Sequence, residues 1–359
     1  MTPSPPTPRR LTPPQLDVMA AGLTLRDMQR AAAATEHAGF DGLWLTEGGR
    51  TAYTAATAAA LATENLTVGT GIAVAFARSP MVTASAAWEL AEATGGRFVL
   101  GLGTQVRPHI ERRYSAEFDR PGPRLREYVG ALRAIWAAFR GEERLRFKGD
   151  FYRFTLMTPE WTPGGSIADP PIYLAGVNPW MLRMIGEVAD GLHVHPLHSV
   201  RYIEEVVRPE LAAGGAADDF ALVCPVMTAT GDTDEEIETE REKLRLRLAF
   251  YGSTPGYSKV FETHGWNDLQ PRLNRLFAAK DRTGMAAAIP DEVLDTLTVS
   301  APWDDLAESL MTRYRGVATR VVAYSAVSNW RESPDVVERW AGVARAFHAP
   351  GQRKGTPAG

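Results

Sequence analysis

The alternation of short β-type runs with longer helical patterns constrains the fold of this chain more than any other feature. Runs rich in apolar and β-branched residues recur eight times, at residues 16–21, 42–46, 67–75, 98–103, 171–176, 191–195, 220–228 and 320–324. Apolar residues at helical spacing fill five of the intervals, at 25–37, 52–63, 82–94, 124–139 and 179–189. This alternation is typical of a parallel sheet with crossover helices, and eight strands close a barrel. The sequence therefore predicts an α/β fold of the (β/α)8 TIM-barrel type.

The length of 359 residues is compatible with two or three average domains, but also with one barrel that carries extra segments. We expect a single barrel domain over residues 14–349. Prolines crowd residues 1–13, which predicts a disordered tail, and residues 350–359 resemble a flexible end. Residues 141–169 and 252–303 break the alternation, so we expect both to be insertions in βα loops that wall the pocket.

Charge and cysteine content exclude several classes of protein. The net charge of -4 gives no overall positive field, so no nucleic-acid partner is expected. No run of apolar residues suits a signal peptide or a membrane span, so neither export nor a membrane partner is expected. The lone Cys224 lies in an apolar run and is interpreted as a core residue. A cytoplasmic location fits these features best.

Glycines at the ends of two predicted strands point to a ligand site. Gly69 and Gly71 lie within the third strand, where glycine signals either a bulge that a flat ligand approaches or a tight barrel corner. Gly101 and Gly103 end the fourth strand, and Thr104 follows them. A bare G-x-G is weak support for a nucleotide, so Thr104 at the strand end is the more useful clue.

The segment Gly176-Val177-Asn178-Pro179 leads from a strand straight into a helix. The first N–H groups of a helix can bind a phosphate or a carboxylate, so this turn is a candidate anion site. The alternative is that Asn178 only caps the helix. Both interpretations remain open from the sequence.

Two histidines lie in the sixth predicted strand and a third follows it, in the pattern His193-Val194-His195-Pro196-Leu197-His198. An H-x-H pair on a strand points two imidazoles to the same side, which keeps a metallohydrolase barrel open as an alternative. No obvious carboxylate or second histidine group completes such a site, so we expect no metal. The histidines then line the pocket, bind phosphate or serve the structure.

A polar loop at 105–114 follows Thr104, and it either faces a ligand or is a solvated run in which Glu111 pairs with arginines. Glu47 comes directly after the predicted second strand, so it has the same placement at a strand end. The chain has no G-x-S-x-G elbow, P-loop lysine or H-E-x-x-H motif, so acyl transfer, nucleotide hydrolysis and zinc proteolysis lack support. A site that has many small residues and few acidic or basic side chains suits a cofactor that supplies the reactive centre.

Taken together, four stretches in this order and spacing resemble the luciferase-like monooxygenase superfamily. They are residues 39–47 (GFDGLWLTE), 68–71 (VGTG), 97–104 (RFVLGLGT) and 189–191 (ADG). The likeness spans roughly residues 16–347. Within the superfamily, the loop 104–113 and the turn 176–179 resemble the branch that uses the deazaflavin coenzyme F420.

The resemblance implies a role for particular residues. Glu47 matches a polar position near the deazaflavin ring, and Gly71-Ile72, preceded by Thr70, matches the site where relatives hold a non-prolyl cis peptide behind the ring. Thr104 and His109 match contacts to the ring or its side chain. The remaining implied cofactor contacts form the phosphate-binding turns, and they are Gly176, Val177, Asn178, Pro179 and His195.

The chain also departs from the family pattern. Sugar-phosphate dehydrogenases of the family have a histidine after the acid of the second strand and a glutamate shortly after the fourth-strand threonine, but this chain has Gly48 and Val106 there. A general acid or base is therefore not inherited, and the candidates are His109, Glu47 and His195.

The implied function is an F420-dependent oxidoreductase that passes a hydride between the deazaflavin C5 and a small organic substrate. The alternatives are an FMN-dependent monooxygenase of the same superfamily and a cofactor-binding barrel without turnover. The resemblance also implies a homodimer.

Overall fold

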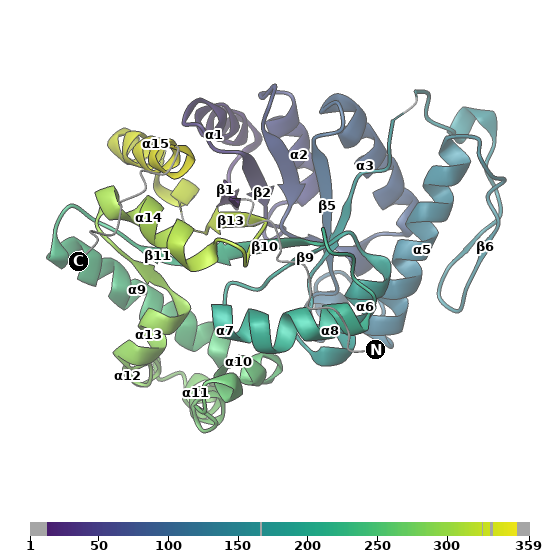
Figure 1. Ribbon diagram of the computed structural model, residues 1–359. Helices are drawn as coiled ribbons and strands as arrows, with labels where there is room; N and C mark the ends of the chain where they lie inside the picture. The colour runs from purple at the N-terminus through teal and green to yellow at the C-terminus, as the bar shows by residue number, and fades with distance from the viewer. Residues whose placement is uncertain (1–12, 166, 325, 331–332, 350–359) are drawn as a thin grey trace, which may run out of the picture.

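The fold is an α/β barrel in which helices surround a closed parallel sheet (Figure 1). The computed structural model describes residues 13–165, 167–324, 326–330 and 333–349. Apart from residue 13, the predicted tails 1–13 and 350–359 lie outside the described residues. The barrel strands are β1 (Gln15–Ala20), β2 (Gly42–Leu45), β3 (Thr67–Thr70) with β4 (Ala73–Val74), β5 (Phe98–Gly103), β8 (Ile172–Leu174), β9 (Gly191–His193), β10 (Ala221–Val226) and β13 (Arg320–Ala323).

The strands run in the order β3-β2-β1-β13-β10-β9-β8-β5-β4, and β3 also pairs with β5, which closes the barrel. Every pairing within this sheet is parallel; for example, Leu43 of β2 lies opposite Val18 of β1 and Val68 of β3. The eight predicted strands are confirmed, each within two residues at its ends. The third strand is interrupted after Thr70 and resumes at Ala73, where β4 pairs with β5.

Helices with one buried face cover the outside of the sheet. The described helices packed around the barrel are α1 (Leu25–His37), α2 (Ala52–Ala60), α3 (Pro80–Ala93), α5 (Pro121–Phe139), α6 (Pro179–Val188), α7 (Val200–Tyr202) with a π-helical turn (Ile203–Val207), α8 (Arg208–Ala213), α14 (Trp303–Tyr314) and α15 (Pro334–His348). Side-chain caps fix several starts; the hydroxyl of Thr24, for instance, accepts the Asp27 N–H at 3.2 Å. The predicted helix 25–37 is confirmed at both ends.

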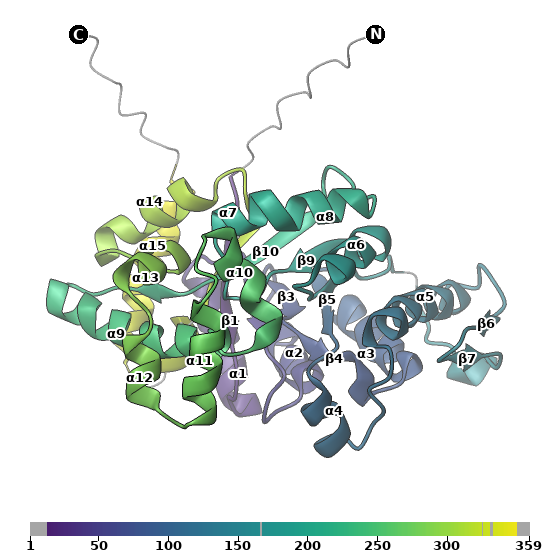
Figure 2. The same ribbon diagram turned by 90° about the horizontal axis from the view of Figure 1, so that it is seen from below.

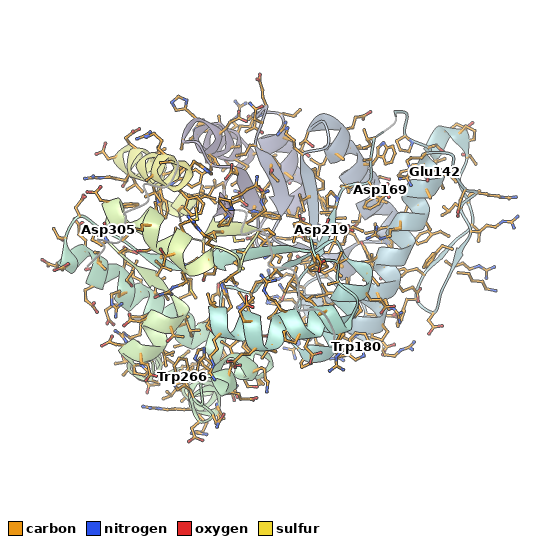
Figure 3. All side chains as sticks on the ribbon, viewed as in Figure 1. Glu142, Asp169, Trp180, Asp219, Trp266 and Asp305 are labelled. Atoms are coloured by element: carbon orange, nitrogen blue, oxygen red, sulfur yellow. The ribbon has the colours of Figure 1, made fainter. Side chains whose placement is uncertain are left out.

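The first predicted insertion, 141–169, follows α5 and precedes β8, so it belongs to an αβ connection. This corrects the expected βα loop, because α5 is itself the crossover helix after β5. The hairpin β6 (Phe147–Lys148) and β7 (Arg153–Phe154) lies beside α5 in Figure 1. Arg140 binds both Glu142 and Asp169, the two acids labelled beside α5 in Figure 3, and so ties the two ends of the segment together.

The hairpin turn returns to the start of α5. The carboxylate of Glu127 accepts the N–H groups of Phe151 and Tyr152, and Arg124 donates to the Tyr152 hydroxyl at 3.0 Å. The N-terminal end of α5 lies at the carboxyl end of the strands. The tip of the segment therefore reaches the catalytic face of the barrel from outside.

The second insertion begins earlier than the predicted 252–303. Strand β11 (Thr228–Ala229) follows β10 directly and pairs with β12 (Val299–Ser300). Between them lie α9 (Asp234–Gly252), a 3-10 turn (Pro255–Tyr257), α10 (Ser258–Thr263), α11 (Leu269–Ala278), α12 (Arg282–Ala287) and α13 (Asp291–Leu297). This segment is a βα connection, as predicted, and α11 and α12 lie toward the same end of the barrel as α4 in Figure 2. Helix α4 spans Arg107–Arg112.

A buried ion pair lies inside the barrel. Arg320 donates to the carboxylate of Asp17 at 2.6 and 3.1 Å, and the indole of Trp44 donates to the same carboxylate at 2.7 Å. Trp44 is fully buried and stacks on Tyr173, with ring centroids 6.0 Å apart. The interior is therefore a packed core rather than a pore.

Cys224 is buried, as predicted, and burial raises the pKa of its thiol to about 12. Within the described parts of the chain, every helix is too short or too polar to cross a bilayer.

Candidate functional site

The break between β3 and β4 is the centre of the candidate site. The Gly71–Ile72 peptide is cis, as the resemblance implies. The Thr46 hydroxyl donates to the Gly71 carbonyl at 3.0 Å, and the Glu47 N–H donates to the Ile72 carbonyl at 3.3 Å. The end of β2 therefore holds the break in place.

Gly71 and Gly103 leave no room for larger residues at this point. A Cβ on Gly71 would lie 2.7 Å from His193 Nε2, and one on Gly103 would lie 2.9 Å from Ile72 Cδ1 and 3.6 Å from the Ala175 Cβ. The start of β4 and the ends of β5 and β8 thus meet beside the break. Gly71 and Gly103 are themselves buried, and their small size lets these segments pack closely at the mouth of the barrel, which is the opening at the carboxyl ends of the strands.

Glu47 is buried and fully engaged. One carboxylate oxygen accepts the Val74 N–H at 2.7 Å and Arg78 Nη1 at 3.0 Å, and the other pairs with Arg78 Nη2. The guanidinium of Arg78 also lies over the Tyr53 ring, 5.0 Å from its centroid. These contacts favour a positioning role for Glu47, since they fix the segment that follows the cis peptide.

Thr70 faces the sheet rather than the mouth. Its hydroxyl donates to the Gly101 carbonyl at 2.7 Å and accepts the Gly101 N–H at 2.8 Å. The residue is fully buried. Its side chain therefore bridges β3 and β5 where the break interrupts their pairing.

The loop after β5 forms a short helix that the sequence did not predict. Thr104 is half-buried, and Gln105 has a φ of 58°, an uncommon value for a residue with a side chain. Helix α4 then carries half-buried His109, while Ile110 anchors the helix in the core. Arg107 pairs with Glu111 at 2.6 Å, so that part of the run is the solvated pair that the sequence left open.

The turn 176–179 both caps a helix and faces the mouth. The Asn178 side chain accepts the Met181 N–H at 2.9 Å, and the Val177 carbonyl accepts the Tyr202 hydroxyl at 2.9 Å. A Cβ on Gly176 would lie 2.7 Å from Ile185 Cδ1, so the turn packs tightly on α6. Pro179 has no N–H and the Met181 N–H is bonded to Asn178, so the N-terminal end of α6, marked by Trp180 in Figure 3, has the Trp180 N–H and a positive dipole end for an anion.

The three histidines have different surroundings. His193 is buried against Trp44 and Gly71, and its Nε2 has no hydrogen-bond partner. His198 bonds the His195 carbonyl at 2.8 Å and the Tyr314 hydroxyl at 3.0 Å, which makes it a structural residue. Burial lowers the pKa of both rings to about 4. Within the described residues, no group of three or more His, Cys, Asp or Glu side chains could hold a metal ion.

His195 lies among tyrosines. Its ring stacks on Tyr257 with centroids 4.2 Å apart and meets the edge of Tyr251 at 4.9 Å. Its Nδ1 accepts the Leu197 N–H at 3.1 Å, which leaves the proton on Nε2. Burial lowers the pKa of His195 to about 3, so the ring is a neutral donor at pH 7.

Sequence reasoning missed Arg78, Tyr251 and Tyr324. Tyr251 comes from the insertion, and its hydroxyl lies 2.6 Å from that of Tyr324, which follows β13. Tyr324 could have been recognised from the sequence. Alternate residues of a strand face the same side, and Arg320 and Val322 face the barrel interior, so Tyr324 is expected to do the same. For Arg78 and Tyr251, the sequence pattern gives no comparable signal.

The fold is a (β/α)8 barrel whose third strand is interrupted near the carboxyl ends of the strands. Residues 10–320 match the model of a family described as luciferase-like monooxygenase. The chain belongs to this family.

Relatives and a solved structure agree with this assignment. The chain is 44% identical over 298 residues to an uncharacterized protein of Mycobacterium tuberculosis, covering 81% of this chain and 88% of the relative. It is 30% identical over 304 residues to 5,10-methylenetetrahydromethanopterin reductase of Archaeoglobus fulgidus, covering 81% and 87%. The fold is similar to that of the coenzyme F420-dependent tetrahydromethanopterin reductase of Methanopyrus kandleri, with a TM-score of 0.74, 16% identity and coverage of 93% and 98%.

Proposed function

We propose that this protein is an F420-dependent oxidoreductase that transfers a hydride between the deazaflavin C5 and a small organic substrate. The observation that carries the proposal is the break in the third strand at Gly71-Ile72, which lies at the carboxyl ends of the barrel strands, as does the N-terminal end of α6. The 30% identity to an archaeal methylenetetrahydromethanopterin reductase supports the choice of this reaction class.

The residues present fit the coenzyme. The break at Gly71-Ile72 would support the flat ring, with Thr104 and His109 along its edge or side chain. The turn Gly176–Pro179 would hold the phosphate with backbone N–H groups. His195 would add a neutral N–H donor between the two.

When bound, the coenzyme supplies the carbon that gives or accepts the hydride. The protein then has to orient the ring and keep water from it. Glu47, through Arg78 and the Val74 N–H, keeps the supporting segment in place. This assigns Glu47 a positioning role and leaves the proton transfer to other groups.

The test is an equilibrium titration of the purified protein with F420 and, separately, with FMN, followed by fluorescence quenching. We expect saturable F420 binding at micromolar concentrations or below and at least tenfold weaker FMN binding. Tight FMN binding without a response to F420 would favour the FMN-dependent monooxygenase instead. Reduced cofactor offered with and without oxygen would then show protein-dependent oxygen consumption.

A further inference from the structure

Two tyrosine hydroxyls meet at the mouth of the barrel. Tyr324 directly follows β13 and packs against the interior cluster that contains Trp44 and Val322. Tyr251 comes from α9 of the second insertion. Their hydroxyl oxygens are 2.6 Å apart, and both side chains are partly exposed. A ligand in the mouth can therefore reach the pair.

Aromatic rings and a guanidinium contact the pair. The guanidinium of Arg247 on α9 lies 5.6 Å from the centroid of the Tyr324 ring. His195 and Tyr257 pack against Tyr251 and each other. Burial, together with Tyr251 and Tyr257, raises the pKa of Tyr324, while Arg247 lowers it. At neutral pH, Tyr324 is therefore an uncharged O–H donor beside a positive charge.

The pair lies across the mouth from the proposed ring site. Counting around the closed sheet, β10 is opposite β3, and β13 is opposite β5. The break at Gly71-Ile72 is thus on one wall, and Tyr251 and Tyr324 are on the facing wall. His193 and His195, successive inward residues of one strand, connect the two walls, since His193 Nε2 abuts Gly71 and His195 abuts Tyr251.

This position suits a group that acts on the substrate. A substrate held between the ring and the far wall would present its reactive carbon to the ring and its polar atom to the tyrosines. Glu47, the acid that the sequence places at the mouth, is occupied by Arg78 and the Val74 N–H. Tyr324 and Tyr251 have the hydroxyls that reach this space.

We propose that the substrate is a small carbonyl compound whose oxygen is held by the Tyr324 and Tyr251 hydroxyls, with Tyr324 as its proton donor. This inference rests on the proposed function for the hydride. In the reducing direction, a hydride from reduced F420 forms the new C–H bond, and the π pair of the carbonyl moves to oxygen. The Tyr324 O–H bond breaks as the alcohol O–H bond forms. The ring-nitrogen proton that reduced F420 loses passes to solvent, and Tyr251 returns a solvent proton to Tyr324.

The test uses 4-nitrophenol, whose phenolate oxygen stands in for the developing alkoxide and whose absorbance reports its ionisation. The F420 titration is done first, and a failure there overturns the proposed function alone. 4-Nitrophenol is then titrated into the F420-saturated protein, or into cofactor-free protein if F420 does not bind. Wild type is compared with Tyr324→Phe, Tyr251→Phe and Tyr152→Phe. Tyr152 is a matched control, because it is a half-buried tyrosine whose hydroxyl bonds Arg124 of α5 and not the Tyr251–Tyr324 pair.

We expect wild type and Tyr152→Phe to bind the probe as its anion and to lower its apparent pKa. Tyr324→Phe should weaken anion binding about tenfold to a hundredfold, since hydrogen bonds to a charged oxygen are the strong ones. Tyr251→Phe should weaken it less. Equal binding by wild type and Tyr324→Phe, or no saturable binding by a wild type that retains its melting temperature, would overturn the proposal.

Discussion

Contacts of single residues decide whether the third strand can break where it does. The Gly101 position is the tightest of them, because a Cβ there would lie 1.8 Å from the Thr70 carbonyl oxygen. The nearest atoms are backbone atoms of Thr70, so rotation of a side chain could not relieve this clash. The hydroxyl of Thr70 then bonds both polar groups of Gly101. Glycine at this position is thus a steric requirement of the fold.

Gly101→Ala is therefore expected to destabilise the protein by at least about 3 kcal/mol, at or beyond the usual range for overpacking a core. Gly48→Ala is the matched control, since a Cβ on Gly48 meets nothing within 4 Å. Urea unfolding of both variants at pH 7 measures the difference. Equal stability of the two variants would show that the β3–β5 contact is wider than described.

A second residue-scale prediction concerns Glu47. Glu47→Gln removes the charge that Arg78 pairs with, and Arg78 is only partly exposed, so the unfolding free energy should fall by about 2 kcal/mol. Cofactor affinity should fall as well, because the segment after Ile72 loses its anchor. If Glu47 were instead a proton donor, Glu47→Gln would lose the same stability but would keep its cofactor affinity and lose turnover. Cofactor binding and turnover measured on one preparation separate these results.

At the scale of elements, β9 and the loop after it make stability depend on pH. His193 and His198 are buried, and their folded-state pKa values of about 4 lie below the ordinary value of about 6.5. The unfolded chain binds more protons between these values, so stability falls as pH drops from about 6.5 toward 4. At pH 5, each of the two histidines should cost about 2 kcal/mol relative to pH 7. Unfolding in urea at both pH values tests this, and unchanged stability would contradict it.

Helix α6 allows a prediction about the anion site. Asn178→Ala removes the cap at Met181 and should cost about 1 kcal/mol of stability. It should also weaken F420 binding severalfold, because the cap orders the turn proposed to hold the phosphate. Thr24→Ala removes the cap of α1 and serves as the control, with a similar loss of stability and unchanged affinity. Equal F420 affinities for the two variants would indicate that another loop binds the phosphate.

For the elements, the sequence predicts best where a strand or helix is long and regularly patterned. The strand at 98–103 and the helix at 25–37 match the structure at both ends. Helix α9 was not recognised, because most of its face is charged and only a few of its residues, such as Leu244 and Leu248, are buried. Helix α4 has six residues and is mostly polar, so its sequence gives little signal. The burial of Ile110 in the folded protein stabilises it.

For the molecule as a whole, the sequence predicted the barrel, because its strands and helices alternate regularly. Residues tied to the course of the backbone, such as Gly71 and the turn Gly176–Pro179, could be proposed as site residues because glycine and proline leave a local signal. Arg78, Tyr251 and Tyr324 depend on contacts between segments far apart in the chain. Those contacts form only once the barrel and its insertion are folded.

We propose that the break in the third strand supports the F420 ring and that the start of α6 binds its phosphate. A crystal structure of the complex with F420 tests both points at once. We predict the ring in van der Waals contact with Gly71-Ile72, the phosphate on backbone N–H groups of the turn Gly176–Pro179 and of Trp180, and the open face of the ring toward Tyr251 and Tyr324. A ring bound away from the break, or a phosphate held by another loop, would contradict the account.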